Sequence, residues 1–320
     1  MNEIIRAYRV YKDTKKENAR CRAINDSNMN LVLQIEAGGR SWLLKHADPW
    51  IRKYPDIAAP ACRTKHEAHF YQYLVCDTDI QEYMPHLLGY NSQENVLVLE
   101  FLESAHSGMG LYKKDIAGIS QNTSVQVLQY LGKLHTKKPI ACIDWTNKAL
   151  RALNHAHIFS IPLEENHNLD KFCHGLQKAS QAFRQDSNIK KRFEELGSLY
   201  LADSSYSLLH GDLYPGSLLL QGKKVFVIDP EFCFVGPAEF DVGVYLAHHL
   251  ILGGPVKDLA LLSNIYQEEA NHSLDLNLLR GFCGSEIIRR LLGVARLPIS
   301  WSLSRYQTML DLGKQLCLQN

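Results

Sequence analysis

Apolar and polar residues follow two different periods along the chain. Up to about residue 102, short apolar runs such as residues 31–35 alternate with polar turns, which is typical of strands. Further along, apolar residues recur at helical spacing, as in residues 127–134. The pattern predicts an α+β chain with a β-rich domain at 1–102 and a mostly helical domain at 103–320. Residues 104–110, rich in Ser and Gly, are predicted as a flexible linker between them.

One apolar run in the second part ends in acidic residues. Residues 225–228 lead directly into Asp229 and Glu231, and Asp212 lies upstream in a His-Gly-Asp-Leu sequence. A buried strand that ends in charge delivers acids to a site at its tip. In an extended chain, the spacing of Asp229 and Glu231 puts both carboxylates on one side.

Three acids in this arrangement suit phosphoryl transfer from a nucleotide. We predict that Asp212 is the general base, and that Asp229 and Glu231 bind a hard cation through oxygen. Phosphoryl transfer needs little more than an oriented hydroxyl and a cation that neutralises phosphate charge. Acids in loops are usually only solvated, but the compound pattern favours a site over that interpretation.

The segment 208–241 resembles the aminoglycoside phosphotransferase and choline kinase superfamily. Within it, HGDLYPGSLLL and VIDPEFCFVGPAEFDVG are most similar to the methylthioribose kinases. The resemblance implies a two-lobed, protein-kinase-like fold that uses ATP and Mg²⁺. It also implies phosphorylation of an alcohol group, with 5-methylthioribose or a related sugar as acceptor, and it is compatible with a homodimer.

The same resemblance assigns nucleotide-binding residues in the β-rich part. Lys45, at the end of a strand, is where kinase folds place the cation that holds the nucleotide phosphates. Glu67 would be the helix partner of Lys45, and Asn28 belongs to a turn that covers the phosphates. The backbone of Glu100 and Leu102 would bind the adenine. A strand-end lysine and a helix glutamate are by default surface groups, so these assignments depend on the resemblance.

In the helical part, the resemblance adds residues around the base. Ser217 would be a further metal ligand, five residues after Asp212, where related kinases more often have Asn. His210 and Asp241 are predicted to be structural. An acid at this helix start receives backbone N–H groups from the catalytic loop in kinase folds, and it also suits the positive end of a helix dipole.

Two adjacent arginines near the C-terminus extend the prediction to the acceptor. Arg289 and Arg290 match an Ile-Arg-Arg-x-x-Gly helix whose arginines line the sugar site in methylthioribose kinases. In an apolar helix such a pair is costly unless at least one arginine has an anionic partner. Tyr214 is also predicted to contact the acceptor. Tyr214 and Pro215 stand where these kinases usually have His-Thr, a departure that concerns acceptor recognition. Ser27 replaces a Gly of the phosphate turn, a departure that concerns how closely the backbone approaches a phosphate.

Composition excludes several other classes of protein. The 320 residues carry a formal net charge of +1, which predicts no nucleic-acid or membrane partner. Eight cysteines without a Cys-x-x-Cys pattern predict neither a zinc site nor disulfides, and indicate a cytoplasmic protein. The charged N-terminus does not resemble a signal peptide, and no apolar run could span a membrane. The pairs His155 and His157, and His248 and His249, do not share a helix face and predict no metal site.

Two other functions remain open. A phosphotransferase for an amine-bearing acceptor, such as an aminoglycoside or choline, would need an acidic or aromatic pocket, and the paired arginines argue against it. A nucleotide-binding protein of kinase fold without catalysis is the other alternative, and the intact acids argue against that. The acceptor, the pathway and the oligomeric state do not follow from the sequence.

Overall fold

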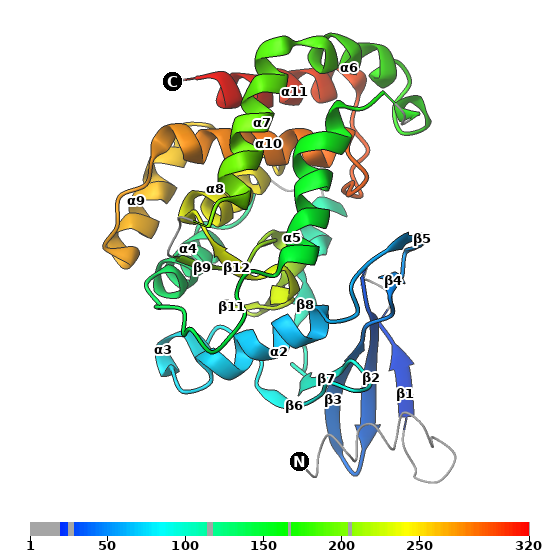
Figure 1. Ribbon diagram of the computed structural model, residues 1–320, viewed down its shortest axis with the longest axis vertical. Helices are drawn as coiled ribbons and strands as arrows, with labels where there is room; N and C mark the ends of the chain where they lie inside the picture. The colour runs from blue at the N-terminus through cyan, green and yellow to red at the C-terminus, as the bar shows by residue number, and fades with distance from the viewer. Residues whose placement is uncertain (1–19, 25–28, 114–117, 166–167, 204–206, 320) are drawn as a thin grey trace. The chain divides into compact units, whose positions relative to one another are not determined.

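The computed structural model describes residues 20–24, 29–113, 118–165, 168–203 and 207–319 (Figure 1). The chain forms two compact units. The first comprises Met1–Ala105 with Phe226–Cys233, and the second comprises His106–Val225 with Phe234–Asn320. The segment that carries Asp229 and Glu231 therefore belongs to the first unit, although the chain on either side of it belongs to the second. Asn28 and Ser27, predicted to lie in a phosphate-covering turn, are outside the described residues.

An antiparallel sheet of five strands organises the first unit (Figure 1). Its strands, in spatial order, are β1 (Arg20–Ala23), β2 (Leu31–Ala37), β3 (Arg40–His46), β7 (Val96–Glu100) and β6 (Leu87–Asn91). Gly38 and Gly39 join β2 to β3 with positive φ at both residues, as a two-residue hairpin turn requires. Leu44 is buried in the apolar cluster of the sheet. Because side chains alternate along a strand, the next residue, Lys45, points to the opposite face.

Helix α2 (Arg63–Leu74) is the main helix of this unit, and it is followed by the single turn α3 (Thr78–Gln81). A small hairpin, β4 (Trp50–Ile51) and β5 (Tyr54–Ala58), precedes α2. The returning segment Phe226–Cys233 packs on α2 through the 3₁₀ turn η6 (Pro230–Phe232). The backbone N–H of Val227 also donates to the carbonyl of Tyr83 at 2.7 Å. These contacts attach Asp229 and Glu231 to the first unit.

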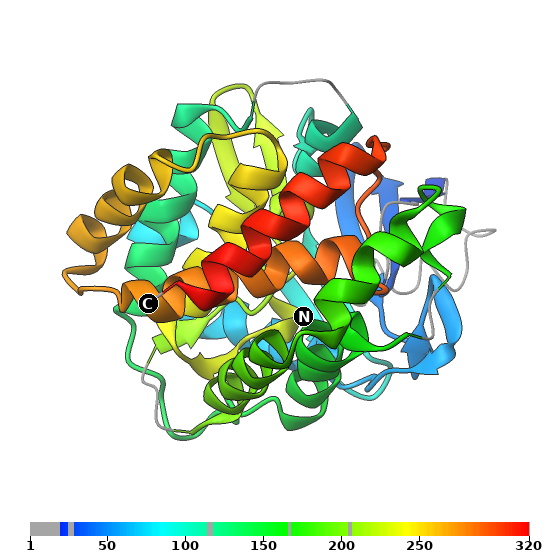
Figure 2. The same ribbon diagram turned by 90° about the horizontal axis from the view of Figure 1, so that it is seen from above.

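Eight α-helices build most of the described part of the second unit. They are α4 (Gln121–His135), α5 (Lys148–His155), α6 (Leu176–Gln185), α7 (Ser187–Leu201), α8 (Ala238–Ile251), α9 (Asp258–Ala270), α10 (Leu276–Leu292) and α11 (Leu303–Leu318). Every residue of α8 is buried, because most of its residues are apolar on all sides and its polar residues Asp241 and His248 have hydrogen-bond partners. Helix α10 packs against both α8 and α11, which Figure 1 and Figure 2 show side by side.

Several helices begin at a side chain that accepts backbone N–H groups. Ser120, Asp186, Asp275 and Ser302 cap α4, α7, α10 and α11 in this way, as short polar side chains do at N-caps. Helix α5 continues into a π-helical turn, η2 (Ala156–Ser160), and then into the 3₁₀ turn η3 (Ile161–Leu163), and a separate 3₁₀ turn, η4 (Leu169–Lys171), lies further along the chain.

Short strands carry the loops of the second unit. One sheet has the order β11 (Lys224–Val227), β10 (Leu218–Gln221) and β8 (His106–Ser107), and the other pairs β12 (Phe234–Gly236) with β9 (Ser207–Leu209). The prediction of a flexible linker at 104–110 is wrong. That segment forms β8 and the 3₁₀ helix η1 (Gly108–Lys113), because strand pairing with β10 and close packing of Gly108 on Pro215 organise it.

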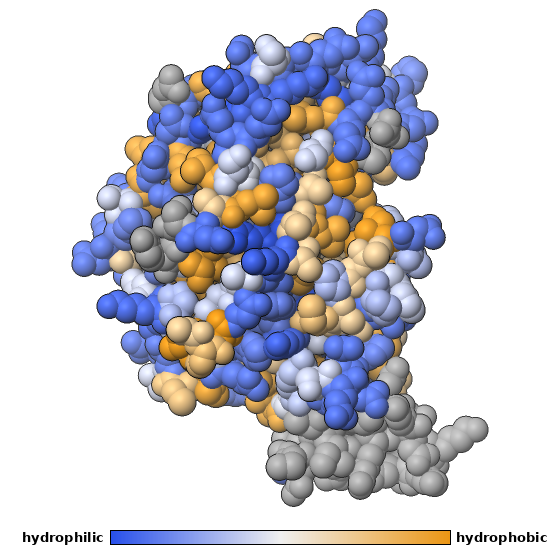
Figure 3. Space-filling model, in the orientation of Figure 1, coloured by the Kyte–Doolittle hydropathy of each residue, from blue (hydrophilic) through white to orange (hydrophobic). Residues whose placement is uncertain are grey.

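Hydrophilic side chains, cysteines and helix composition describe the surface and the chemistry of the described residues. On the face that Figure 3 shows, hydrophilic side chains gather over α6 and α7. None of the eight cysteines, all of which lie in the described ranges, forms a disulfide. Among the described residues, none of the helices combines the length and the apolar composition that crossing a bilayer requires.

Candidate active site

The loop that carries Asp212 follows β9 and is held by a buried acid. Asp241, on the first turns of α8, accepts the backbone N–H of His210 at 2.6 Å and that of Gly211 at 3.0 Å. The ring of His135 lies 3.3 Å from the same carboxylate. The contact predicted between an acid at this helix start and the backbone of the catalytic loop is therefore present. Hydrogen bonds to a charged acceptor are among the stronger ones, so the loop is firmly positioned.

Ser217 braces the other end of the loop. Its hydroxyl donates to the carbonyl oxygen of Asp212 at 2.8 Å, and its backbone N–H donates to the carbonyl of Tyr214 at 2.8 Å. Ser217 and His210 are buried, whereas the side chain of Asp212 is 17% exposed. The structure therefore gives Ser217 a bracing contact, and its role as a metal ligand stays a prediction.

Arg289 and Arg290 both reach Asp212 from α10. Nη1 of Arg289 and Nη2 of Arg290 each lie 3.1 Å from Oδ1 of Asp212. Glu286, one turn earlier on the same helix, accepts Nη1 of Arg289 at 3.0 Å and Nε of Arg290 at 2.5 Å. Both arginines are almost fully buried, and two carboxylates balance their charge. The anionic partners that the sequence required for this pair are Asp212 and Glu286.

The charge on Glu286 follows from this arrangement. Burial acts to raise the pKa of Glu286, but Arg289, Arg290 and a hydrogen bond from His248 together bring it well below its ordinary value. Arg290 responds in the opposite direction. Burial acts to lower its pKa, and Glu286 and Asp212 raise it above the ordinary value. Glu286 and Arg290 are therefore both charged at neutral pH.

Three further side chains complete the surroundings of the arginines. The guanidinium of Arg290 lies 4.2 Å from the centre of the Tyr214 ring, within cation–π range. Oδ1 of Asn154 accepts Nη2 of Arg289 at 3.0 Å, and its Nδ2 donates to the carbonyl of Gly211 at 3.3 Å. Burial, together with the charge of Arg289, lowers the pKa of His157 to about 4.

Sequence reasoning missed Glu286 and Asn154. A signal for Glu286 was available, since an acid three and four residues before two arginines on a helix shares their face. Asn154 had no such signal, because its contacts with Arg289 and Gly211 join residues far apart in the chain.

A second cluster lies within the first unit. Nζ of Lys45 is 2.6 Å from Oε1 of Glu67 and also binds the carboxylate of Asp229. Lys45 is 3% exposed and Glu67 is fully buried, so the predicted pair of these two residues is present. Burial acts to lower the pKa of Lys45, but Asp229 and Glu67 raise it above its ordinary value. Burial raises the pKa of Glu67 to about 7.

The backbone around Asp229 is not the extended strand that the sequence predicted. Asp229 has φ +66°, and Pro230–Phe232 forms the 3₁₀ turn η6. Proline at the first position of this turn favours it, because the fixed φ of the ring suits a helical start. The prediction that Asp229 and Glu231 lie on one side of an extended chain is therefore wrong.

Glu231 is held by partners that the sequence did not identify. Its Oε2 accepts Nδ2 of Asn30 at 2.8 Å and lies 3.7 Å from Nε of Arg63. Arg63 also donates to Oδ1 of Asn30 at 2.7 Å and to the carbonyls of Met29 and Asp48. No sequence motif marks Arg63, because its partners come from separate loops.

The predicted metal ligands differ in how well they suit Mg²⁺. The side chain of Asp229 is 42% exposed and offers the carboxylate oxygen that a hard cation prefers. The carboxylate of Glu231 is buried against Asn30 and Arg63. Within the described ranges, no group of three or more His, Cys, Asp or Glu side chains could hold a metal ion. The metal-binding roles therefore stay predictions, with Asp229 the residue that fits best.

Glu100 and Leu102 lie at and just beyond the end of β7. The backbone N–H of Glu100 donates to the carbonyl of His86 at 2.9 Å, and the carbonyl of Leu102 accepts the N–H of Ala105 at 3.3 Å. These bonds stabilise the turn after the strand. The prediction that this backbone binds adenine stays a prediction.

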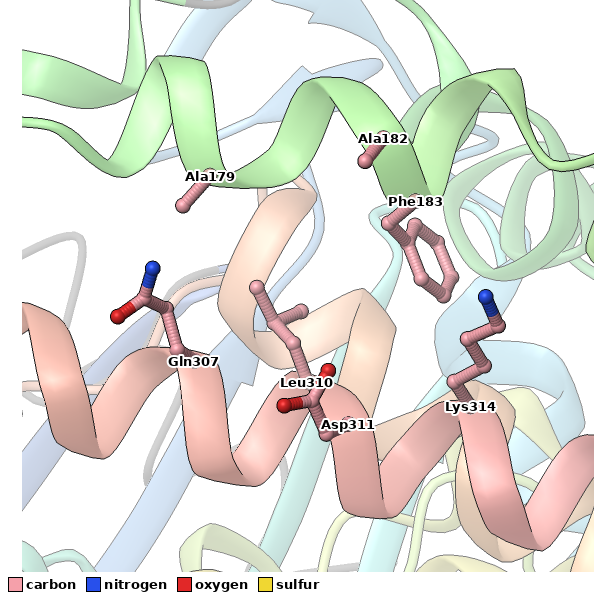
Figure 4. Close-up of a pocket in the computed structure, with 7 residues that line it drawn as sticks. All are labelled: Ala179, Ala182, Phe183, Gln307, Leu310, Asp311 and Lys314. Carbon is pink, nitrogen blue, oxygen red and sulfur yellow. The ribbon is translucent and has the colours of Figure 1, made fainter.

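A separate hollow of the second unit lies between α6 and α11, with a volume of about 400 Å³ (Figure 4). Its lining comes from both helices and consists of Ala179, Ala182, Phe183, Gln307, Leu310, Asp311 and Lys314. None of these is a predicted site residue. The hollow is therefore not part of the candidate site. The predicted site residues lie in two separate clusters, the one around Asp212 in the second unit and the one around Lys45 in the first.

Known proteins resemble the chain over most of its length. A methylthioribose kinase of Bacillus velezensis is 24% identical over 93% of this chain and 86% of its own length. A methylthioribose kinase of Geobacillus kaustophilus is 26% identical over 87% of this chain and 79% of its own. A choline/ethanolamine kinase family protein from Mesorhizobium loti superposes with a TM-score of 0.54 at 12% identity, over 99% of this chain and 95% of its own.

These comparisons confirm the predicted fold and the predicted resemblance. The solved structure shows the fold, an α+β protein-kinase-like fold with a β-rich N-terminal part and a mostly helical C-terminal part. A family model described as the phosphotransferase enzyme family matches residues 126–293, just over half of the chain, and includes the Asp212 loop and both arginines. The chain therefore belongs to the phosphotransferase enzyme family.

Proposed function

We propose that this protein is an ATP-dependent kinase that transfers the γ-phosphoryl group to a hydroxyl of a small sugar, 5-methylthioribose or a close relative. The observation that carries the proposal is the contact of Asp212 with Arg289 and Arg290, each at 3.1 Å. The match to proteins named methylthioribose kinase along most of the chain supports the choice of acceptor.

Asp212 would act on the acceptor hydroxyl. Both arginines bind its Oδ1, and no hydrogen bond reaches Oδ2 from the described residues. Oδ2 would therefore accept the hydrogen of the acceptor hydroxyl and orient its oxygen for attack. The Asp241 side chain, which accepts the N–H groups of His210 and Gly211, and the Ser217 hydroxyl, which donates to the carbonyl of Asp212, would hold this residue in place during the reaction.

The charge around Asp212 selects the kind of acceptor. Two buried guanidinium groups provide N–H donors and positive charge, which suit the oxygens of a sugar and the developing charge of a transferred phosphoryl group. The ammonium group of an aminoglycoside or choline offers no acceptor for these N–H donors, and Asp212 and Glu286 already pair with the arginines. This is the physical reason to prefer a neutral sugar over an amine-bearing acceptor.

The first unit would bind the nucleotide. Lys45 carries a positive charge held by Glu67 and would contact the phosphates. Asp229 would hold Mg²⁺, and Glu231 and Ser217 are the further predicted ligands. The metal, when bound, neutralises charge on the nucleotide phosphates. The backbone of Glu100 and Leu102 would contact the adenine.

The proposal is tested by ADP release from the purified protein in Mg-ATP, with and without methylthioribose. We expect release that depends on the sugar, and its loss in Asp212→Asn with ATP affinity largely kept. Asp311→Asn, which changes an exposed acid of α11, is the matched control and should behave as the unchanged protein.

Three other results of these measurements would contradict parts of the proposed function. ATP binding without sugar-dependent release would support a nucleotide-binding protein without catalysis. Release that depends on an aminoglycoside or choline, and not on sugars, would overturn the acceptor assignment. A loss of ATP affinity in Asp212→Asn as large as the loss of rate would refute its role as the base.

A further inference from the structure

A chain of three buried polar side chains leads from η1 to the arginines. The hydroxyl of Tyr112, on η1, is hydrogen-bonded to Nδ1 of His248, on α8. Nε2 of His248 lies 3.0 Å from Oε1 of Glu286, on α10. Glu286 in turn binds both Arg289 and Arg290. Three elements that are distant in sequence therefore meet at the pair of arginines that contacts Asp212.

The direction of each hydrogen bond in this chain follows from chemistry. Glu286 is ionised and can only accept, so Nε2 of His248 must carry a hydrogen. Burial lowers the pKa of His248 to about 4, so the ring is neutral and its Nδ1 is an acceptor. Burial raises the pKa of Tyr112 well above its ordinary value, so its hydroxyl donates. In the resulting arrangement, Tyr112 donates to Nδ1 of His248, and Nε2 of His248 donates to Glu286, so all three side chains have a partner.

Glu286 controls the geometry of both arginines. Its Oε2 holds Arg289 and its Oε1 holds Arg290, so the orientation of one carboxylate determines where both guanidinium groups point. The hydrogen bond from His248 to Oε1 determines that orientation. Without the charge of Glu286, two buried cations would face the single carboxylate of Asp212, and both would shift toward it. The acceptor hydroxyl would then meet a displaced or covered base.

We propose that Glu286 is a positioning residue, oriented by His248 and Tyr112, that sets Arg289 and Arg290 at the distance from Asp212 that an oxygen-rich acceptor requires. The inference rests on the proposed function for the identity of the acceptor, and on geometry alone for the chain itself. Folding does not demand such a chain, because buried ionic groups can often be replaced by apolar ones without loss of stability.

The kinetic test uses substitutions that keep shape and remove one interaction. Glu286→Gln removes the charge, and Tyr112→Phe removes the donor to His248. We expect Glu286→Gln to lower kcat/KM for the acceptor on the order of 100-fold, the usual effect of a displacement of about 1 Å at a reacting group. Tyr112→Phe should lower the same kcat/KM for the acceptor by a smaller factor. The KM for ATP should stay the same in both variants.

Two substitutions of His248 separate positioning from packing. The amide nitrogen of His248→Gln takes the place of Nε2 and can still donate to Glu286, whereas the shorter His248→Asn overlays Nδ1 and cannot. The Gln variant should keep most of the acceptor kcat/KM, and the Asn variant should lose it. Equal losses in both, or a change in KM for ATP of the same size, would overturn the positioning role.

A measurement without turnover tests the chain even if no acceptor is found. The ¹⁵N shifts of the His248 ring at pH 7 should show a hydrogen on Nε2 and none on Nδ1. A hydrogen on Nδ1, or a doubly protonated ring, would overturn the proposed chain. Absent sugar-dependent ADP release together with the expected ring shifts would instead count against the proposed function and leave the chain standing.

Discussion

The carboxylate of Asp241 accepts the backbone N–H of His210 at 2.6 Å in the interior of the second unit. The same side chain accepts the N–H of Gly211, so one acid positions the loop that carries Asp212. In Asp241→Asn, the amide nitrogen would turn a donor toward a backbone donor. We expect a loss of about 2 kcal/mol in the free energy of unfolding.

The same substitution should reduce turnover, because the loop would no longer hold the base in one place. Urea unfolding and ADP release on the same preparation measure the two effects. The exposed control Asp311→Asn should change neither. Full turnover in a folded Asp241→Asn protein would show that the loop does not need this acid.

Lys45 and Glu67 form a buried pair whose members can be removed one at a time. Lys45→Met leaves Glu67 buried without its cation, and breaking such a pair costs about 3–5 kcal/mol. Adding Glu67→Met removes the uncompensated acid, so the double variant should recover much of the lost stability.

Nucleotide affinity should respond differently from stability. Neither variant has the cation that would contact the phosphates, so ATP binding measured by calorimetry should be weak in both. Recovery of ATP binding together with stability in the double variant would contradict the nucleotide role of Lys45.

Gly108 and Gly110 lie on the same 3₁₀ helix, η1, and provide a matched pair. A Cβ on Gly108 would lie 2.2 Å from the backbone oxygen of Pro215, whereas a Cβ on Gly110 would meet no atom within 4 Å. Gly108→Ala must therefore move the loop between Asp212 and Ser217. We expect a loss of about 1–3 kcal/mol in stability, together with reduced turnover.

Gly110→Ala should leave both stability and turnover unchanged. Thermal unfolding and ADP release compare the two variants directly. A Gly108→Ala protein as stable and active as Gly110→Ala would show that η1 does not pack on the catalytic loop in solution.

His248 predicts a dependence of stability on pH. Its pKa is lowered to about 4 by burial, from about 6.5 in the unfolded chain. Between these values the unfolded state binds more protons than the folded state, so stability falls as the pH is lowered from about 6.5 to about 4. The contribution is on the order of 3 kcal/mol for a shift of this size.

His248→Gln has no titrating ring and should lose this part of the pH dependence. His157, whose pKa is also lowered to about 4, should retain its own part. Urea unfolding at pH 4.5, 5.5 and 7 measures the difference between the two proteins. Parallel pH profiles would mean that His248 is not buried as a neutral ring.

The local sequence predicted much of the framework. The strand over residues 31–35 and the helix that includes residues 127–134 follow from the period of apolar residues, which acts over a few neighbouring positions. Composition was misleading at residues 104–110, because the order of η1 comes from packing on Pro215. The two-residue alternation failed at Asp229, where the turn places the carboxylate against Lys45.

By itself, the sequence determined the α+β class, the acidic pattern from Asp212 to Glu231, and the pair Arg289 and Arg290, because these features are contiguous or periodic. Only the tertiary structure decided which groups hold them. Asn30 with Arg63, and Tyr112 with His248 and Glu286, meet through contacts between residues far apart in the chain. Such contacts depend on how separate elements pack, and no spacing along one chain records that arrangement.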